Sequence, residues 1–163
     1  MIKNLKVDDI KGNLCTKLAK MLQVQNSKGM TPLTASVEHG NYEIFRFIVD
    51  LSIHLQKTFV NHPVLSKTID VKDDRQETAM IKAVRMQRIQ MCYTFLHLIG
   101  PTEMIAYSSV TQTDSTGRNV LHHSVINKMK ELVQRFVLID TDQKTLRNTK
   151  DAKGKTPQAL DEQ

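Results

Sequence analysis

Two adjacent histidines, His122 and His123, are the residues of this sequence whose types most suggest chemistry. Imidazole rings bind zinc, but zinc ligands on one helix stand four positions apart, as in H-E-x-x-H. Adjacent residues on a helix instead point about 100° away from each other. No cysteine or carboxylate stands at a matching spacing, so the pair predicts no metal site.

Two cysteines, Cys15 and Cys92, are the candidate nucleophiles. A catalytic thiolate needs a paired base, but Cys15 has only Lys17 close by and no histidine in its segment. Cys92 lies in an apolar helical stripe, which is typical of a small buried side chain. Neither belongs to a C-x-x-C pair, and two cysteines are too few for a disulfide framework, so we expect a reducing, intracellular setting.

Paired acids stand at 8–9 and at 73–74. For metal binding or acid–base work they would need partners that converge from elsewhere in the chain. Gly29 and Gly117 belong to neither a G-x-G-x-x-G motif nor a P-loop, so no phosphate cradle is predicted. The sequence therefore predicts a protein that is not an enzyme and that needs no cofactor.

Composition narrows the class further. The chain has 163 residues, a net charge of +6, 5% aromatic residues and no tryptophan, and its pI is about 9.4. Scarce aromatics favour stacked helices with an aliphatic core over a β-sandwich. The longest run without a formal charge, 89–102, is too short to span a bilayer, and the N-terminus lacks the apolar region of a secretory signal.

The elements that would position these residues are short helices, and 26–51 shows them best. A turn signal ends at Gly29, Thr31 can cap a helix, and Pro32 fits the first turn. A stop signal follows at Gly40. Two helices this short need a copy of themselves alongside to bury their apolar faces. The apolar residues of the second helix are Ile44, Phe45, Phe47, Ile48 and Leu51.

This stretch resembles an ankyrin repeat, whose pattern is D-x-x-G-x-T-P-L-H-x-A-A-x-x-G followed by an apolar second helix. Thr34 stands where the pattern has His, and Ser36 and Val37 stand where it has the Ala pair. The match is specific for the fold and says little about the partner. The matching residues are Asn26, Gly29, Thr31, Pro32, Leu33 and Gly40.

Three further copies follow the first. In the second copy, 73–99, Gln76 and Gln87 replace the two glycines of the pattern, and glycine is the residue that reaches positive φ without strain. In the third copy, 114–138, Lys128 replaces the second glycine. The third copy matches the pattern at Asp114, Gly117, Leu121 and His122, and the fourth matches at Asp151, Gly154, Thr156 and Pro157.

The resemblance implies an all-α fold, an ankyrin-repeat solenoid of helix-turn-helix units with short hairpin loops, in a single domain 1–163. An amphipathic segment, Leu14 to Leu22, would form the N-terminal cap of the stack. The expected parts are the cap (1–25), repeat 1 with an extension (26–72), repeat 2 with an extension (73–113), repeat 3 (114–147) and a partial repeat 4 (148–163).

Inside these parts we expect a lengthened second helix in the first repeat, a break near Asn61–Pro63 and a short helical piece before the next hairpin. The second extension, 100–113, is expected to hold a short helix through Tyr107. By resemblance, the ring of His122 bonds backbone near the hairpin and Asp73 bonds turn backbone, so both are structural.

The resemblance also implies where a partner binds, because ankyrin repeats contact partners through their hairpin tips and the concave face of each first helix. Six of the implied residues are basic and three are acidic, so we expect an acidic protein segment as the partner, anchored on Met30, Met86 and Ile126. The alternative is that the extensions bind it. The implied residues are Ser27, Lys28, Met30, Glu38, His39, Asp74, Arg75, Glu77, Arg85, Met86, Ser115, Thr116, Arg118, Ile126, Asn127, Ala152, Lys153 and Lys155.

The expected function is therefore protein–protein interaction without catalysis. Small stand-alone ankyrin proteins include inhibitor-of-NF-kappa-B-like proteins and effectors of viruses and intracellular pathogens, so an inhibitory role is one interpretation. The chain is alternatively the ankyrin portion of a larger channel, enzyme or adaptor. A rival of another class is nucleic-acid binding through the basic surface, although stacking aromatics are scarce. The sequence does not indicate an oligomeric state.

Overall fold

The protein is all-helical over the residues that the computed structural model describes, which are 7–58, 64–99, 106–140 and 144–161. This confirms the expected all-α class. In chain order the helices are α1 (Val7–Met21), α2 (Pro32–His39), α3 (Tyr42–Thr58), α4 (Val64–Ile69), α5 (Ala79–Arg85), α6 (Ile89–Ile99), α7 (Tyr107–Val110), α8 (Val120–Ile126), α9 (Lys130–Ile139), α10 (Thr145–Asn148) and α11 (Pro157–Asp161).

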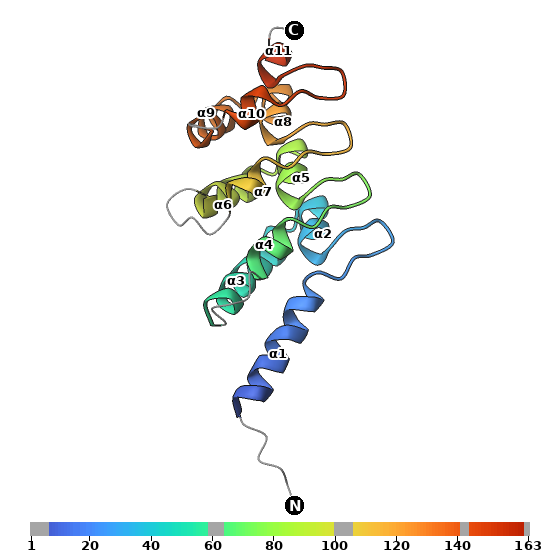
Figure 1. The fold of residues 1–163 in the computed structure, drawn as a ribbon, viewed down its shortest axis with the longest axis vertical. Helices are drawn as coiled ribbons and strands as arrows, with labels where there is room; N and C mark the ends of the chain where they lie inside the picture. Colours follow the sequence, from blue (N-terminus) through green and yellow to red (C-terminus); the bar gives the residue numbers. More distant parts are fainter. Residues whose placement is uncertain (1–6, 59–63, 100–105, 141–143, 162–163) are drawn as a thin grey trace, which may run out of the picture.

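The helices form antiparallel pairs that stack along one axis (Figure 1). Helices α2, α5, α8 and α11 form one layer, in which each packs on the next, and α3, α6 and α9 form a second layer behind them. Helix α1 lies at the N-terminal end and touches α3. The four loops that precede the first-layer helices all project to the same side.

The four projecting loops share one hydrogen-bond pattern and begin at Asn26, Asp73, Asp114 and Asp151. In each, the backbone N–H of the first residue donates to the carbonyl of the fifth, at 2.8 to 3.1 Å. The side-chain Oδ1 of the first residue accepts from the N–H groups of the third and fifth residues. We call the segments that start at these loops units 1 to 4 and compare positions by counting from the four residues.

Each loop ends on a residue whose side chain caps the helix that follows. The hydroxyls of Thr31, Thr78 and Thr156 each accept a hydrogen bond from the N–H three residues on. In unit 3 the cap is Asn119, which accepts from two N–H groups of the first turn. These caps satisfy N–H groups that have no partner inside the helix, so they fix where each first-layer helix begins.

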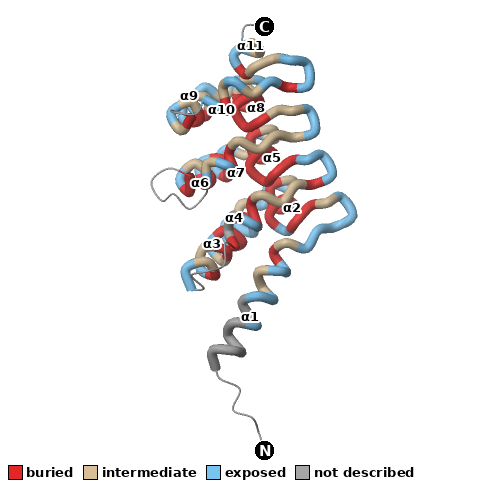
Figure 2. Tube along the Cα trace, viewed as in Figure 1, coloured by how far each residue is buried: buried red, intermediate tan, exposed pale blue. Residues whose placement is uncertain are grey.

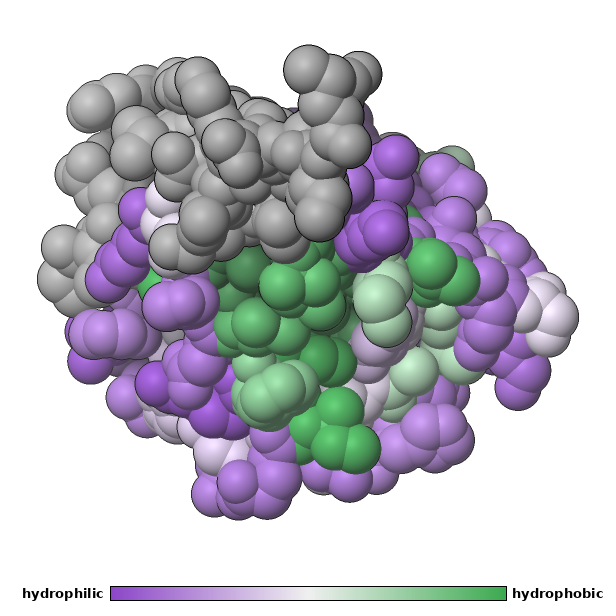
Figure 3. All heavy atoms as spheres, turned by 90° about the horizontal axis from the view of Figure 1, so that it is seen from below, coloured by the Kyte–Doolittle hydropathy of each residue, from purple (hydrophilic) through white to green (hydrophobic). Residues whose placement is uncertain are grey.

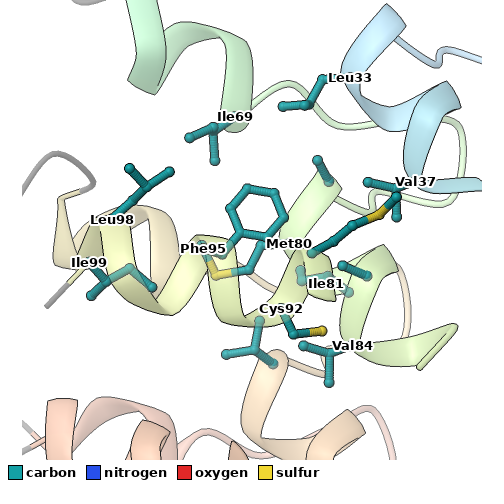
Figure 4. Packing of buried hydrophobic residues seen from close by; sticks show 14 of the residues in the cluster. Leu33, Val37, Ile69, Met80, Ile81, Val84, Cys92, Phe95, Leu98 and Ile99 are labelled. Carbon is teal, nitrogen blue, oxygen red and sulfur yellow. The ribbon is translucent and has the colours of Figure 1, made fainter. Parts of the chain in front are cut away.

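The core lies between the two layers, where Figure 2 shows the buried residues. The rings of Phe45 in α3 and Phe95 in α6 meet edge to face with centroids 5.2 Å apart, which joins unit 1 to unit 2. Figure 4 shows the Phe95 ring among Ile69, Leu98 and Met80. Three short helical segments are thus tied together by one aromatic side chain.

Some local expectations are wrong in detail. Ile44 and Phe47 were expected in the apolar core stripe of α3, but 51% and 67% of their surfaces are exposed. The buried stripe of α3 runs instead along Phe45, Ile48, Val49, Ser52 and Leu55.

The short helix expected to run through Tyr107 begins at that residue and ends at Val110. In the first extension, α3 continues to Thr58 and α4 is the short helical piece before the next hairpin. The expected break at 61–63 lies outside the described residues.

Candidate protein-binding surface

The tips of the four loops form one continuous edge, which we call the hairpin edge (residues 26–30, 73–77, 114–118 and 151–155). Backbone hydrogen bonds join each tip to the next: the N–H of Asp74 donates to the carbonyl of Lys28 at 3.2 Å, and the N–H of Ser115 donates to that of Arg75 at 3.0 Å. The N–H of Ala152 donates to the carbonyl of Thr116 at 2.8 Å. This ladder fixes the tips relative to one another.

The third residue of each loop projects an exposed side chain from this ladder. These residues are Lys28, Arg75, Thr116 and Lys153, so three of the four are cationic. Among the described residues, none of the three cations has an ion-pair partner within 4.0 Å. The hairpin edge therefore carries a row of unpaired positive charges, with one gap at Thr116.

Behind the first two tips lies a buried ionic cluster centred on Lys82 in α5. The ammonium of Lys82, only 3% exposed, lies 2.6 Å from Glu38, 2.8 Å from Asp73 and 3.5 Å from Glu77. Arg85 closes the cluster by donating from Nη2 to Glu77 Oε2 at 3.0 Å. Burial alone would lower the pKa of Lys82, but its bonds to Asp73 and Glu38 outweigh burial and raise it. The cluster is structural, because every charge in it has a partner.

A small hollow of about 210 Å³ opens above this cluster. The bond to Lys82 lowers the pKa of Glu38, which keeps that carboxylate ionised. The hollow joins the hairpin edge to the exposed side of the first-layer helices. Its lining residues are Lys28, Met30, Glu38, Asp73, Asp74, Arg75 and Lys82.

Unit 3 repeats this arrangement with a histidine in place of the lysine. His123 stands where unit 2 has Lys82, and its Nε2 lies 2.8 Å from Oδ2 of Asp114. The neighbouring His122 ring accepts from the N–H of Asn119 through Nδ1, at 3.3 Å, and its Nε2 lies 3.2 Å from the carbonyl oxygen of Lys155. The expected structural role of His122 is confirmed, and so is that of Asp73, whose Oδ1 holds its loop.

Ten of the residues implied for partner binding lie exposed on the hairpin edge or at the ends of the first-layer helices: Ser27, Lys28, His39, Asp74, Arg75, Ser115, Thr116, Ile126, Ala152 and Lys153. Six are partly buried: Glu38, Arg85, Met86, Arg118, Asn127 and Lys155. Met30 and Glu77 were expected to be exposed contact residues, and this expectation is wrong because both are buried. Met30 lies against the Lys82 ammonium, and Glu77 is held by Arg85 and Lys82.

Several partly buried residues already serve internal contacts between units. The Asn127 carboxamide donates to the carbonyls of Val84 and Arg85 at 2.8 and 3.1 Å, and the Arg118 guanidinium lies 3.3 Å from Asp151. Such residues shape the surface more than they project from it. The side chains that project most freely are Lys28, Arg75 and Lys153, whereas the hydroxyl of Thr116 donates to Oδ1 of Asp114 at 2.7 Å.

Two important residues were missed at the level of sequence, Lys82 and Arg88. The Arg88 guanidinium donates to the carbonyls of Val37 and Glu38, at 3.2 and 2.9 Å, and so ties α2 to the turn before α6. The available signal for Lys82 was a lysine surrounded on both sides by apolar residues in α5. For Arg88 there was no local signal, because its acceptors lie about fifty positions away.

Cys92 is the candidate nucleophile whose side chain the structure describes, and it is buried. Burial raises the pKa of the Cys92 thiol to about 12, so the thiol is neutral at pH 7 and fits the interpretation of a small buried side chain. The described segments contain no cluster of three or more metal-ligating side chains. In the same segments, no helix has both the length and the apolar character to cross a membrane.

The chain was compared with protein-family models and with curated proteins, and no family model and no curated protein matches it. The assignment of a function therefore depends on the geometry and charge of the surface described above.

Proposed function

We propose that this protein is a non-catalytic, ankyrin-type helical solenoid that binds an acidic segment of another protein along its hairpin edge. The observation that carries the proposal is the row of unpaired cations at Lys28, Arg75 and Lys153, one on each of three tips. Cations arranged in this way attract a polypeptide with carboxylates, because each can gain a charge-assisted hydrogen bond without losing an internal one.

Rigidity of the edge supports this proposal. The tips are held by the backbone ladder and by the loop carboxylates and amide, so little conformational entropy is lost when a partner binds. The backbone positions that carry the cations are therefore fixed relative to one another before the partner arrives. A partner with acidic residues spaced to reach successive tips is selected by this preorganisation.

Apolar contact is available at the other end of the first-layer helices, away from the row of cations. Ile126 is exposed at the C-terminal end of α8, and Met86 is half-buried at the corresponding end of α5. A partner segment that carries apolar residues between its acidic ones gains affinity here, since apolar burial contributes more to affinity than exposed ion pairs do. Such a partner would be occluded from its own ligands, and an inhibitory role inside a reducing compartment follows from the proposal.

The test is a binding titration with a synthetic peptide that alternates glutamate and leucine, read by backbone amide NMR shifts. The variant Lys28→Glu/Arg75→Glu/Lys153→Glu should weaken binding about tenfold or more, because three exposed contacts of up to about 1 kcal/mol each are reversed. The matched control is Lys57→Glu/Lys67→Glu/Arg135→Glu, which changes net charge equally at exposed positions of α3, α4 and α9. Equal loss in both variants would contradict the proposal.

Thr116, the uncharged third residue of unit 3, allows a second measurement in the same titration. Thr116→Lys should strengthen binding, because it places a fourth cation at the exposed third position of unit 3. A single-stranded oligonucleotide serves as competitor, since a row of cations also suits phosphates. Displacement of the peptide by oligonucleotide at low salt, with tighter binding of the oligonucleotide than of the peptide, would favour the nucleic-acid alternative.

A further inference from the structure

The N-terminal end of the stack carries an exposed apolar surface that is separate from the hairpin edge. Figure 3 shows this end, where hydrophobic residues gather into one patch that polar residues border on the sides away from the grey atoms. Large apolar patches on a protein surface mark sites of association. We define the N-terminal patch as the exposed residues Leu14, Met21, Val24, Pro32, Ile44 and Phe47.

Comparison with the inner units indicates what kind of surface this is. Ile44 in unit 1 is 51% exposed, whereas the residues at the same position of units 2 and 3, Met91 and Leu132, are each 2% exposed. Pro32 is likewise exposed, although Ala79 at its position in unit 2 is fully buried. The N-terminal face of unit 1 thus has the composition of a face that the inner units bury completely.

Helix α1 covers only part of this face. Its Leu18 and Ala19 pack against the core, and Leu22 is buried. A hollow of about 450 Å³ remains open between the end of α1 and the outer side of α2. Helix α1 presents Leu14 and Met21 to solvent, and Met21 also lines this hollow. Both the helix and the face it partly covers therefore keep an unburied apolar edge.

The charges beside the two apolar edges have opposite signs. At 100° per residue, Lys17 lies beside Leu14 and Met21 along α1, and Lys20 lies farther round on the same side. These two lysines are exposed.

Along α3, the exposed acids Glu43 and Asp50 flank Phe47 in the same way. Asp50 is already paired to Arg46, so Glu43 is the freer acid of the α3 edge. A basic apolar edge and an acidic apolar edge thus stand on the same end of one molecule.

We propose that the N-terminal patch is the interface of a symmetric dimer of this chain. The α1 edge of one copy packs on the α3 edge of its partner, and the converse contact forms at the same time, as a two-fold axis requires. Leu14 and Met21 then cover Ile44 and Phe47 of the other copy. The lysines of each α1 edge meet the acids of each α3 edge, which sets the orientation.

Sedimentation equilibrium across a concentration series tests this interface. The wild-type chain should form a dimer, and Phe47→Glu should raise the dimer dissociation constant at least tenfold, because it places a charge in the centre of the apolar contact. The matched control is Leu138→Glu, since Leu138 on α9 has the same 67% exposure as Phe47. A wild-type chain that stays monomeric up to about 1 mM, the range of very weak association, would overturn the proposal, and so would equal weakening by both variants.

A charge swap tests the two-fold arrangement itself. Lys17→Glu and Glu43→Lys should each weaken the dimer. When the two variants are mixed, one contact of the mixed dimer keeps the native pair and the other holds the reversed pair, so association should recover. Native mass spectrometry identifies the mixed dimer, and failure of the mixture to recover overturns the arrangement. None of these variants touches the hairpin edge, so peptide binding there should be unchanged.

Discussion

Units 1 and 2 build the same two turns from different residues. In unit 1 the turns contain Gly29 and Gly40, both with φ of 69°, and in unit 2 the same positions hold Gln76 and Gln87, with φ of 58° and 56°. The backbone hydrogen bonds of the two turns in unit 1 recur in unit 2, which adds a bond from the N–H of Ile89 to the carbonyl of Gln87. The comparison teaches that loop hydrogen bonds impose the left-handed conformation and that glycine only lowers its cost.

The two units also differ in what lies behind the loop. Unit 2 has the buried Lys82 cluster, whereas unit 1 has Ala35 at the same position of its first helix and Asn26 in place of the loop aspartate. Unit 1 therefore holds its loop with a neutral amide, and unit 2 holds it with a carboxylate that needs a buried cation.

The largest effect is expected from Lys82→Met. This change removes the cation and leaves Asp73 and Glu77 buried without it, which should lower the free energy of unfolding by about 3 to 5 kcal/mol. Urea denaturation measures the change. Adding Asp73→Asn, the amide that unit 1 uses, should recover part of the loss. A double variant less stable than the single one would show that the units hold their loops by unrelated means.

Replacing glycine in the loops should lower the free energy of unfolding by a smaller amount. The size of this loss should depend on the space available for the added side chain. A Cβ at Gly29 would lie 2.9 Å from the backbone nitrogen of Asp74, whereas a Cβ at Gly154 would meet nothing within 4 Å. Gly154→Ala should cost about 1 to 2 kcal/mol for positive φ alone, and Gly29→Ala should cost more than that. Thermal denaturation of both variants checks this order. Equal melting temperatures of Gly29→Ala and Gly154→Ala would contradict it.

The opposite substitution should stabilise unit 2. Gln76→Gly and Gln87→Gly each remove the strain of a side chain at positive φ, so each should raise the unfolding free energy by up to about 1 kcal/mol. The matched control is Gln90→Gly in the first turn of α6, which should destabilise by about 0.5 to 1 kcal/mol. The strain argument would be contradicted if Gln90→Gly stabilised the protein. It would also be contradicted if neither Gln76→Gly nor Gln87→Gly did so.

The last prediction concerns how stability depends on pH. Burial alone would raise the pKa of Asp114, but hydrogen bonds from the His123 ring, the Thr116 hydroxyl and two backbone N–H groups hold it well below its usual range. A carboxyl whose folded pKa lies below its unfolded value of 3.8 stabilises the fold above that pH, and the contribution is lost as the pH falls.

The Asp114→Asn variant should therefore have a lower melting temperature than the wild type at pH 6 to 7. The gap between the two melting temperatures should narrow below about pH 4. The amide keeps the loop acceptor, as Asn26 does in unit 1. Melting temperatures of both proteins from pH 3 to pH 7 measure the gap. A gap that stays constant over this range would show that the charge of Asp114 contributes nothing.

Local sequence signals predict the loops and the first-layer helices well. Thr31, Pro32 and Gly40 lie within one short stretch, and the hydrogen bonds that they imply join residues three to five positions apart. The second-layer helix α3 was predicted less well, because its apolar residues cover more than one face. The stripe that contains Ile44 and Phe47 satisfies the same helical period as the buried one, so periodicity alone could not decide between them.

The candidate surface was predicted only in part for a related reason. Lys28, Arg75 and Lys153 follow from loop positions alone, and all three are exposed. The burial of Met30 and Glu77 depends on Lys82 and Arg85, and the pairing of Glu38 with Lys82 spans 44 positions. Contacts between residues so far apart in the sequence depend on how the units stack, so a short motif does not predict them.

The backbone ladder along the hairpin edge couples each described unit to its neighbours in the stack. A chain of nearest-neighbour couplings behaves like a one-dimensional lattice, in which the ends open more readily than the middle. Units 2 and 3, which pack on a neighbour at each side, should therefore show the slowest amide hydrogen exchange in the stack.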